Sequence, residues 1–462
     1  MSEKPLALPL IAVVSNRGEQ ADVDARLING FVEKTELDGV WCYKRPGYET
    51  YYNGFTGVGR GTYFWDEGTA SLLGDVYSVF GSNLYRGSTV LGAVNADTDM
   101  YTFAGSQGAT PKLFMNCSTK AYTTDGTTVT QVTDVDYPAL TVPGAVNLDG
   151  TIYVMTPDAY ILGSDLNDPT SWDSLNSIRV QIDPGKGVAI AKQLNYLIAF
   201  KEFSTEVFYD AANAAGSPLG RVEAAKLGVG CAAADSIASI DGALIWVSGS
   251  AKAGRKVMLM EALKAKEVST PAVERLLQSL DSPKGTAFGI SGHRFYVLTD
   301  IFFGMQRTLV YDLDEKLWFE WEAVDGGTLQ FISSTVGSNQ EVLVQLYDAE
   351  VVRIRSSLNA DKGQAFSWDL YTPNFDAGTR LGKVVNKLEV TADQQNNSML
   401  EVRFSDDDYQ TWSPARTLDL SRKQAWTTKM GKFVKRAHWF HQRLNVPLRI
   451  KAVDLHTDLC TL

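Results

Sequence analysis

The residues best suited to catalysis or metal binding in this chain are few and widely spaced. Only four histidines are present, and His438 and His441 are three positions apart. In a strand this spacing puts the two imidazoles on opposite faces, which does not favour a shared metal ion. The cysteines form no CxxC pair, so free thiols in a reducing compartment are expected rather than disulfides or zinc. They are Cys42, Cys117, Cys231 and Cys460. We therefore expect no metal and no cofactor.

Two glycine-rich stretches are candidates for cradling phosphate, GVGRGT at 57–62 and GTRLGKV at 378–384. Neither has the spacing G-x-x-x-x-G-K-[ST], and neither lies between a strand and a helix. The chain has no GxSxG nucleophile motif, and nothing in its many carboxylates selects a catalytic pair. Both stretches are therefore interpreted as turns, and the chain is predicted not to be an enzyme.

The acidic run Asp406–Asp408 could hold calcium, but adjacent carboxylates in a turn usually form a solvated loop. The run lies in SDDDYQTW, which looks like an Asp-box, the hairpin motif Ser-x-Asp-x-Gly-x-Thr-Trp, although Tyr409 stands where the motif has glycine. The matching residues are Ser405, Asp407, Thr411 and Trp412. In families that carry the box, the aspartate bonds to the turn backbone and the tryptophan packs beneath it. The motif therefore predicts a β-hairpin rather than a catalytic site.

A basic stretch near the C-terminal end is the most informative electrostatic feature. From Arg416 to Lys451 the chain has ten Lys or Arg and one acid, Asp419, which gives +9. The whole chain carries −11, so −20 remains on the rest. We expect this stretch to dock on an acidic patch of a neighbouring subunit or partner. The candidate interface residues are Lys432, Lys435, Arg436, Trp439, Phe440 and Arg443. A solvated basic face and contact with nucleic acid are the alternatives.

Length and composition indicate the kind of fold that must hold these residues. The 462 residues are 44% hydrophobic and 21% charged, which is typical of a globular chain of two or three domains, or of one large β architecture with an appendage. Many glycines and aromatics favour an all-β fold. The net negative charge argues against a general nucleic-acid-binding surface, but not against a protein that DNA passes. The apolar stretch 6–14 is short and contains Pro9, so no signal peptide or membrane anchor is expected.

A loose repeat runs through the middle of the chain. Each copy has an apolar residue, usually a turn such as Asp-Gly or Ser-Gly, and a strand of aromatic and branched residues. Copies occur at 79–87, 147–155, 240–248 and 290–298, with weaker ones at 109–117, 192–200 and 336–346. A period of about 40–50 residues matches a four-stranded antiparallel blade. We therefore predict a β-propeller of six or seven blades over 61–358, the alternative being an array of sandwiches with chance hairpin spacing.

The rest of the chain divides around this propeller. Helical periodicity is best over 270–280, where Thr270 can cap a helix and Pro271 can start it. Residues 359–462 are predicted to form a separate C-terminal β-sandwich or platform module. Its expected strands are 383–392, 399–405, 437–442 and 448–453. Residues 1–60 contain a short strand pattern at 26–33 and are too few for a core of their own, so they should complete one of the two larger modules.

The order and spacing of several segments now resemble a known family. They are SNRGEQADVDARLINGFVEK (15–34, including Arg17, Asn29 and Phe31), 164–176 followed by 198–211, the helix at 269–280, and the final segments 404–420 and 435–453. Together they resemble the packaged-DNA stabilisation proteins of short-tailed bacteriophages, also called tail hub or nozzle proteins.

The resemblance implies a structural virion protein without catalysis. It implies assembly in the host cytoplasm into a ring, usually of six copies, beneath the portal and adaptor. Such a ring extends the DNA channel, helps to retain the packaged genome and gives tailspikes or fibres and a central needle something to bind. Packaged DNA would pass without specific binding, and an acidic body suits such a channel because fixed cations would grip phosphate.

Two other function classes stay open from the sequence. One is a glycan-binding or sialidase-like propeller, in which aromatics such as Trp65 and Trp172 would stack on sugars. The other is a cytoplasmic scaffold propeller without phage partners.

Overall fold

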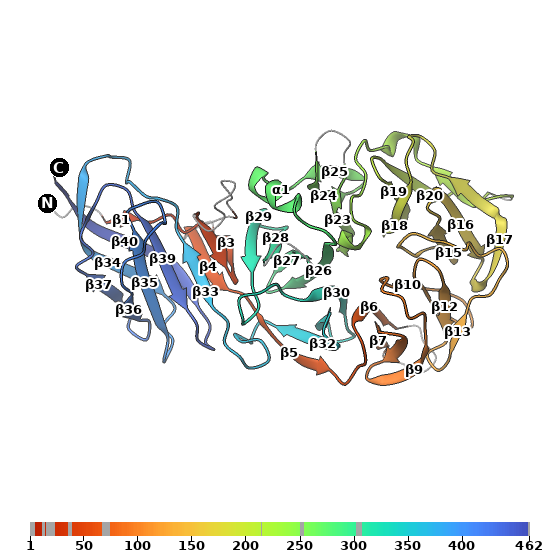
Figure 1. Cartoon of the computed structure of the whole chain (residues 1–462), viewed down its shortest axis with the longest axis horizontal. Coiled ribbons are helices and arrows are strands. Elements are labelled where there is room, and N and C mark those ends of the chain that lie inside the picture. The colour runs from red at the N-terminus through yellow and green to blue at the C-terminus, as the bar shows by residue number, and fades with distance from the viewer. Residues whose placement is uncertain are drawn as a thin grey trace.

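The computed structural model describes residues 5–11, 14, 24–35, 39–66, 74–213, 215–249, 254–301 and 307–460. Positions 15–23 of the resemblance segment 15–34, including Arg17, lie outside these residues. Nearly all regular structure is β. Two bodies lie side by side along the long axis, a propeller at one end and a β-sandwich at the other, and both chain termini lie at the sandwich end (Figure 1).

Seven four-stranded antiparallel units surround the propeller axis, and six of them are separate sheets. Blade 1 contains β6 (Gly59–Trp65), β7 (Asp75–Phe80), β8 (Asn83–Arg86) and β9 (Thr89–Ala93). Blade 2 contains β10 (Thr102–Gly105), β11 (Leu113–Asn116), β12 (Ala121–Thr124) and β13 (Val129–Gln131). Blade 3 contains β14 (Val146–Leu148), β15 (Thr151–Met155), β16 (Tyr160–Asp165) and β17 (Asp168–Arg179). Blade 4 contains β18 (Gly187–Gln193), β19 (Tyr196–Lys201), β20 (Thr205–Asp210) and β21 (Leu219–Arg221).

The remaining three blades complete the ring. Blade 5 contains β22 (Ala238–Ile240), β23 (Ala243–Ser248), β24 (Lys256–Glu261) and β25 (Lys264–Glu267). Blade 6 contains β26 (Lys284–Ile290), β27 (His293–Thr299), β28 (Thr308–Asp312) and β29 (Leu317–Trp321). Blade 7 contains β30 (Phe331–Val336), β31 (Val342–Leu346), β32 (Glu350–Arg355) and β5 (Gly47–Tyr52). Because β5 comes from the N-terminal segment and pairs with β32, the chain closes its own ring.

A hydrophobic cluster fills the contact between each pair of neighbouring blades. Between blades 4 and 5, for example, Trp246 packs edge-on against Phe200 at 5.0 Å between ring centroids. The second strand of each blade is almost entirely buried, as in β15 and β23. One blade cannot cover its own two faces, so radial packing against neighbours supplies the core.

The repeat prediction is confirmed for the propeller, with one shift of phase. The strands predicted in the copies at 109–117, 147–155, 192–200, 240–248, 290–298 and 336–346 all fall on second strands of blades 2 to 7. The copy at 79–87 instead joins β7 to β8, the second and third strands of blade 1. The predicted helix is α1 (Pro271–Leu277), capped by the Thr270 side chain. Two short 3-10 turns occur at Glu223–Ala225 and Ala234–Ser236.

The sandwich is built from strands near both ends of the chain. One sheet has the order β3-β4-β40-β34-β37, with β1 beside β40 and β38 beside β34. Its strands are β1 (Leu6–Ala7), β3 (Gly30–Thr35), β4 (Gly39–Lys44), β34 (Gly382–Ala392), β37 (Ala425–Thr428), β38 (Lys432–Phe433) and β40 (Arg449–Cys460). The facing strands are β2 (Arg26–Ile28), β33 (Trp368–Tyr371), β35 (Met399–Ser405), β36 (Arg416–Asp419) and β39 (Ala437–Gln442). Apolar side chains such as Val390, Phe440 and Ile450 fill the space between the sheets.

One continuous sheet joins the two bodies. Strand β2 pairs on one side with β29 of blade 6 and on the other with β33, which makes a nine-stranded sheet. The single strand expected at 26–33 is divided at Asn29, whose φ of 54° turns the chain from β2 into β3 of the opposite sheet. The N-terminal segment therefore contributes strands to both bodies, where the sequence suggested one.

Candidate assembly interface

The six interface residues expected from the sequence do not form one surface. Lys432, Lys435 and Arg443 are exposed and Trp439 is half-buried, whereas Arg436 and Phe440 are buried. The alternation of side chains along β39 explains part of this division, because Phe440 faces the space between the sheets and Trp439 faces outward. Phe440 belongs to the core and cannot touch a partner.

Arg436 corrects the expectation of a surface charge most clearly. Its guanidinium is 1% exposed and pairs with both carboxylate oxygens of Asp406, at 2.6 and 2.7 Å. It also donates to the Met430 carbonyl at 2.7 Å and lies 3.8 Å from the centre of the Phe404 ring. These contacts hold the hairpin after β35 against the segment before β39. The residue is therefore part of the fold, not of a docking surface.

Trp439 has its ring faces occupied by the chain itself. Tyr371 stacks on it with centroids 5.2 Å apart, and the Arg403 guanidinium lies 4.7 Å from the ring centre. Its indole N–H donates to Asp369 at 2.7 Å. His441 bonds to the same carboxylate, and this hydrogen bond raises the pKa of the imidazole. The arrangement stiffens the outer face of the sheet and leaves little of the ring for a partner.

Arg443 also has a role within the chain. Its guanidinium donates to the carbonyl of Val324, beyond β29, at 3.0 Å and to the carbonyl of Ala365 at 3.4 Å. The side chain therefore bridges the propeller and the sandwich at their junction.

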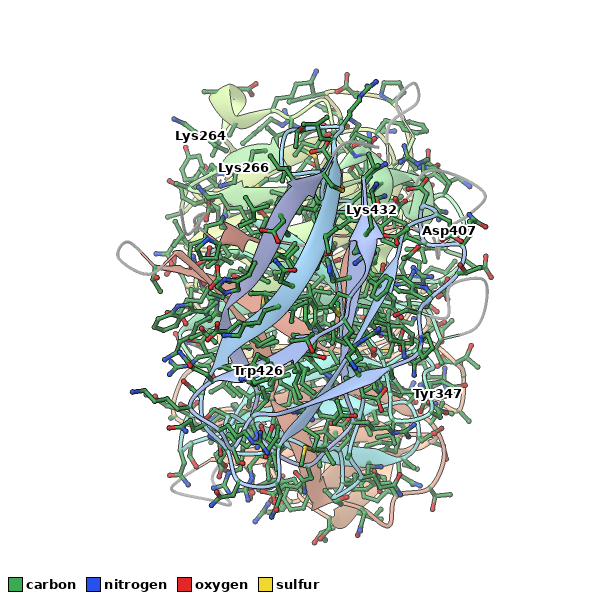
Figure 2. All side chains as sticks on the ribbon, turned by 90° about the vertical axis from the view of Figure 1, so that its left-hand side faces the viewer. Lys264, Lys266, Tyr347, Asp407, Trp426 and Lys432 are labelled. Carbon is green, nitrogen blue, oxygen red and sulfur yellow. The ribbon has the colours of Figure 1, made fainter. Side chains whose placement is uncertain are left out.

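Lys432 belongs to a second group of exposed basic residues, which lies along one open edge of the sandwich. Among the described strands, β37 and β38 both pair with β34 and with no strand on their other side. Among the described residues, Lys423, Lys429 and Lys432 along this edge form no ion pair, whereas Arg449 and Lys451 share Asp393. Between them Trp426 is 54% exposed, beside the ammonium of Lys387. We call Lys423, Trp426, Lys429 and Lys432 the basic edge. Figure 2 shows Trp426 and Lys432 on the end of the molecule that the sandwich forms.

Of the four residues of the basic edge, only Lys432 was among the candidates that the sequence indicated. The stretch 416–451 contains all four residues, yet the sequence alone does not show which of its arginines form ion pairs within the chain. Alternation along a strand would have assigned Phe440 to the core, but the Arg436–Asp406 pair needs the fold.

The Asp-box-like segment forms a tight local network. Asp407 accepts hydrogen bonds from the Thr411 amide at 2.9 Å and from the Ser405 hydroxyl at 2.7 Å, which lower its pKa to about 2 together with the Thr411 hydroxyl. Tyr409 takes the position of the motif's glycine with a φ of 68°. Trp412 packs against the rings of Tyr371 and Trp439. All the groups of this network are engaged within the chain.

A polar network fixes the junction of the two bodies. The Asn29 side chain donates to the Ser367 carbonyl and accepts from Arg45 and from the Glu322 amide, each at 2.8 Å. Arg45 is 1% exposed and makes a bidentate pair with Asp361 at 3.0 and 2.6 Å. Because Glu322 follows blade 6 and Ser367 precedes β33, this network ties the propeller to the sandwich.

The propeller axis contains a cavity of about 620 Å³ lined by the first strands of the blades. Two of its charged lining residues are engaged within the chain, since Asp235 pairs with Lys284 and Lys192 donates to the Asn147 carbonyl. Within the described ranges, no three His, Cys, Asp or Glu side chains are grouped so that they could hold a metal ion. Trp65 and Trp172 are buried between blades and cannot stack on a sugar.

Comparison with solved structures places the chain beside other proteins of low identity. The streptogramin B lyase structure is 12% identical, with 67% of this chain and 97% of that chain covered and a TM-score of 0.43. BamB from Moraxella catarrhalis is 13% identical, with 76% and 98% covered and a TM-score of 0.41. YCF48 bound to D1 peptide is 14% identical, with 67% and 97% covered and a TM-score of 0.41. None of the curated proteins matches this chain.

In the described part of the chain no helix has the length and apolar character needed to span a membrane. The family model described as Bacteriophage P22 Gp10, beta-propeller matches residues 19–319, which is more than half of the 462 residues. The chain therefore belongs to this family of structural phage tail proteins, and its location is the virion.

Proposed function

We propose that this protein is the tail hub, or nozzle, of a short-tailed phage. In this role, copies form a ring, usually of six, below the portal and adaptor. The ring extends the DNA channel, retains the packaged genome, and anchors tailspikes or fibres and a needle. The family match over 19–319 is the observation that carries the proposal.

The architecture supports a load-bearing role rather than a catalytic one. A closed propeller and a sandwich share a continuous sheet and a buried Arg45–Asp361 pair, so force on one body passes directly to the other. The division into 1–60, 61–358 and 359–462 is kept as a proposal for how the chain is organised. The charge of −11 suits a channel wall that DNA must pass without being held.

Genome retention is the function to test first. In a producing phage, the gene is interrupted by a suppressible stop codon, and particles are purified from the non-suppressing host. We expect heads that package DNA and then lose it, measured as nuclease-protected DNA per particle. The suppressing host supplies the matched control. Particles without the protein that keep their DNA and infect normally would refute the role.

A further inference from the structure

The end of the propeller opposite to the sandwich is acidic and apolar. From residue 121 to residue 178 the chain has eight aspartates and no glutamate, lysine or arginine. These residues build the outer part of blade 2 and all four strands of blade 3. Blade 3 lies at the far end of the long axis from the sandwich (Figure 1). The stretch therefore carries an unbalanced charge of −8, opposite in sign to the +9 of the basic C-terminal stretch.

The same end exposes an unusual number of large apolar side chains. They are Val135, Leu140, Tyr160, Leu166 and Leu175, each between 41% and 94% exposed. Some of them border a surface hollow of about 560 Å³ whose lining includes Pro138, Pro157 and Leu162. Scattered single apolar residues need no explanation, but a group around a hollow marks an interaction site. We call the exposed residues of 121–178 the acidic end.

The carboxylates of the acidic end are available to a partner. Among the described residues, Asp136, Asp158 and Asp165 make no ion pair, although Asp165 accepts a hydrogen bond from the Ser171 hydroxyl at 2.6 Å. Asp158 also lines the hollow. Asp134, by contrast, accepts from the Trp172 and Asp136 amides and serves the local fold. Charge at the rim and apolar surface at the centre is the pattern of a protein interface.

The basic edge of the sandwich is the complement of this surface. It offers ammonium groups around Trp426, and tryptophan is enriched among residues that dominate binding energy. Lysines alone on an open strand edge would only discourage unwanted strand pairing. An exposed tryptophan among them has no such use. It suits the hollow of the acidic end, which Leu140, Tyr160 and Asp158 help to line.

We propose that the basic edge of one copy docks on the acidic end of the next copy, with Trp426 entering the hollow beside Tyr160. The two surfaces lie at opposite ends of the molecule, so the contact is head to tail and each copy keeps one free end. A contact of this kind closes into a ring when its rotation allows. The proposal deepens the proposed function and rests on it, since it names the surfaces through which ring neighbours meet.

The first test uses tails purified from infected cells. A zero-length carbodiimide couples a lysine amine to a contacting carboxylate as an amide, with loss of water, and mass spectrometry identifies the joined peptides. We expect dimers of this chain linking Lys423, Lys429 or Lys432 to Asp136, Asp158 or Asp165. Links from those lysines only to other tail proteins, or to a different part of this chain, would overturn the proposal while leaving the tail role intact. Absence of the chain from tails would instead overturn the tail role.

The second test is a charge exchange in the same phage. One variant carries Lys423→Glu, Lys429→Glu and Lys432→Glu, and another carries Asp136→Lys, Asp158→Lys and Asp165→Lys. We expect each to reduce incorporation into tails at least tenfold, because like charges then meet, and the sixfold variant to recover to within about twofold. The control reverses Lys264 and Lys266, exposed lysines on β25 of blade 5 (Figure 2), and should assemble normally, although Lys266 also loses its surface ion pair with Glu261.

Folding must be separated from docking in this comparison. The exchanged residues lie at the surface and form no internal ion pair, so each variant should unfold at the wild-type temperature. Variants that fold normally but still assemble, or a sixfold variant that stays defective, would overturn the head-to-tail contact. Trp426→Ala should reduce incorporation at least tenfold without any change of charge.

Discussion

The propeller and the sandwich solve the problem of burying β-sheets in different ways. Each of blades 1 to 6 is one continuous piece of chain, and neighbouring blades share their own cluster of apolar side chains. The sandwich combines strands from 6–44 with strands from 368–460, and its interior and junction contain charged groups such as Arg45, Asp361 and Arg436. The propeller is therefore stabilised by many similar local contacts, whereas the sandwich is stabilised by a few specific long-range contacts.

The Arg45–Asp361 pair offers the strongest way to break this comparison. Arg45→Met leaves the Asp361 carboxylate buried without its partner, which costs about 3–5 kcal/mol in unfolding free energy. We expect hydrogen exchange, followed by mass spectrometry, to rise in the sandwich strands β33, β34, β39 and β40. Peptides of blades 2 to 4 should keep their protection, because their clusters do not include the junction.

A surface arginine of the propeller is the matched control for Arg45. Arg355 on β32 is about half-exposed and lies 3.4 Å from Glu49. Arg355→Met should change the unfolding free energy by no more than about 1 kcal/mol, since solvent screens such a pair. Equal losses for the two variants, or loss of protection across all blades in Arg45→Met, would contradict the division into local and long-range stabilisation.

Arg436 and Lys435, neighbouring basic residues of the sandwich, should differ in how much they contribute to stability. Arg436→Met removes a charged hydrogen-bond network with Asp406 and Met430 and should cost about 1.5–3 kcal/mol. Lys435→Glu alters an exposed side chain 3.9 Å from Asp408 and should change stability by about 0.5 kcal/mol or less. Chemical denaturation of the two variants measures both values. If Arg436→Met is as stable as the wild type, the fold does not need the Arg436 network, and Arg436 is again a candidate for the assembly interface.

The sequence predicted the parts of the fold that are local. The second strands of the blades are visible because their residues are apolar at nearly every position and recur with each blade, and Thr270 with Pro271 marks the start of α1. Strands β35 and β39 were predicted with the bounds that the structure gives. Each of these signals lies within about ten consecutive residues.

The long-range parts could not be predicted in the same way. Nothing around Asn29 indicates that its backbone takes a left-handed conformation, or that the strand before it joins blade 6 while the strand after it joins the far sheet. Strand β5 is separated by about 300 residues from the strand that it pairs with. At the candidate interface, the basic composition was visible, but Arg436 differs from Lys432 only through Asp406, a partner thirty positions away.

A buried histidine gives the sandwich interior an effect on stability that depends on pH. Within the described part of the chain, neither ring nitrogen of His438 has a hydrogen-bond partner, and burial lowers the pKa of the imidazole to about 3. The unfolded chain takes up a proton near pH 6.5, whereas the folded chain does not until far lower pH. Stability is therefore complete above pH 6.5 and falls by about 1.4 kcal/mol per pH unit as the pH drops below it.

Replacing His438 by leucine should remove that slope. The difference in unfolding free energy between His438→Leu and the wild type is then expected to grow by about 2 kcal/mol between pH 6.5 and pH 5, in favour of the variant. Taking the difference cancels the other titrating groups, including His441, whose raised pKa acts in the opposite direction. Phe440→Leu, a buried change on the same strand without a titrating group, should shift stability equally at both pH values. Parallel pH curves for His438→Leu and the wild type would show that the imidazole is already charged in the folded sandwich.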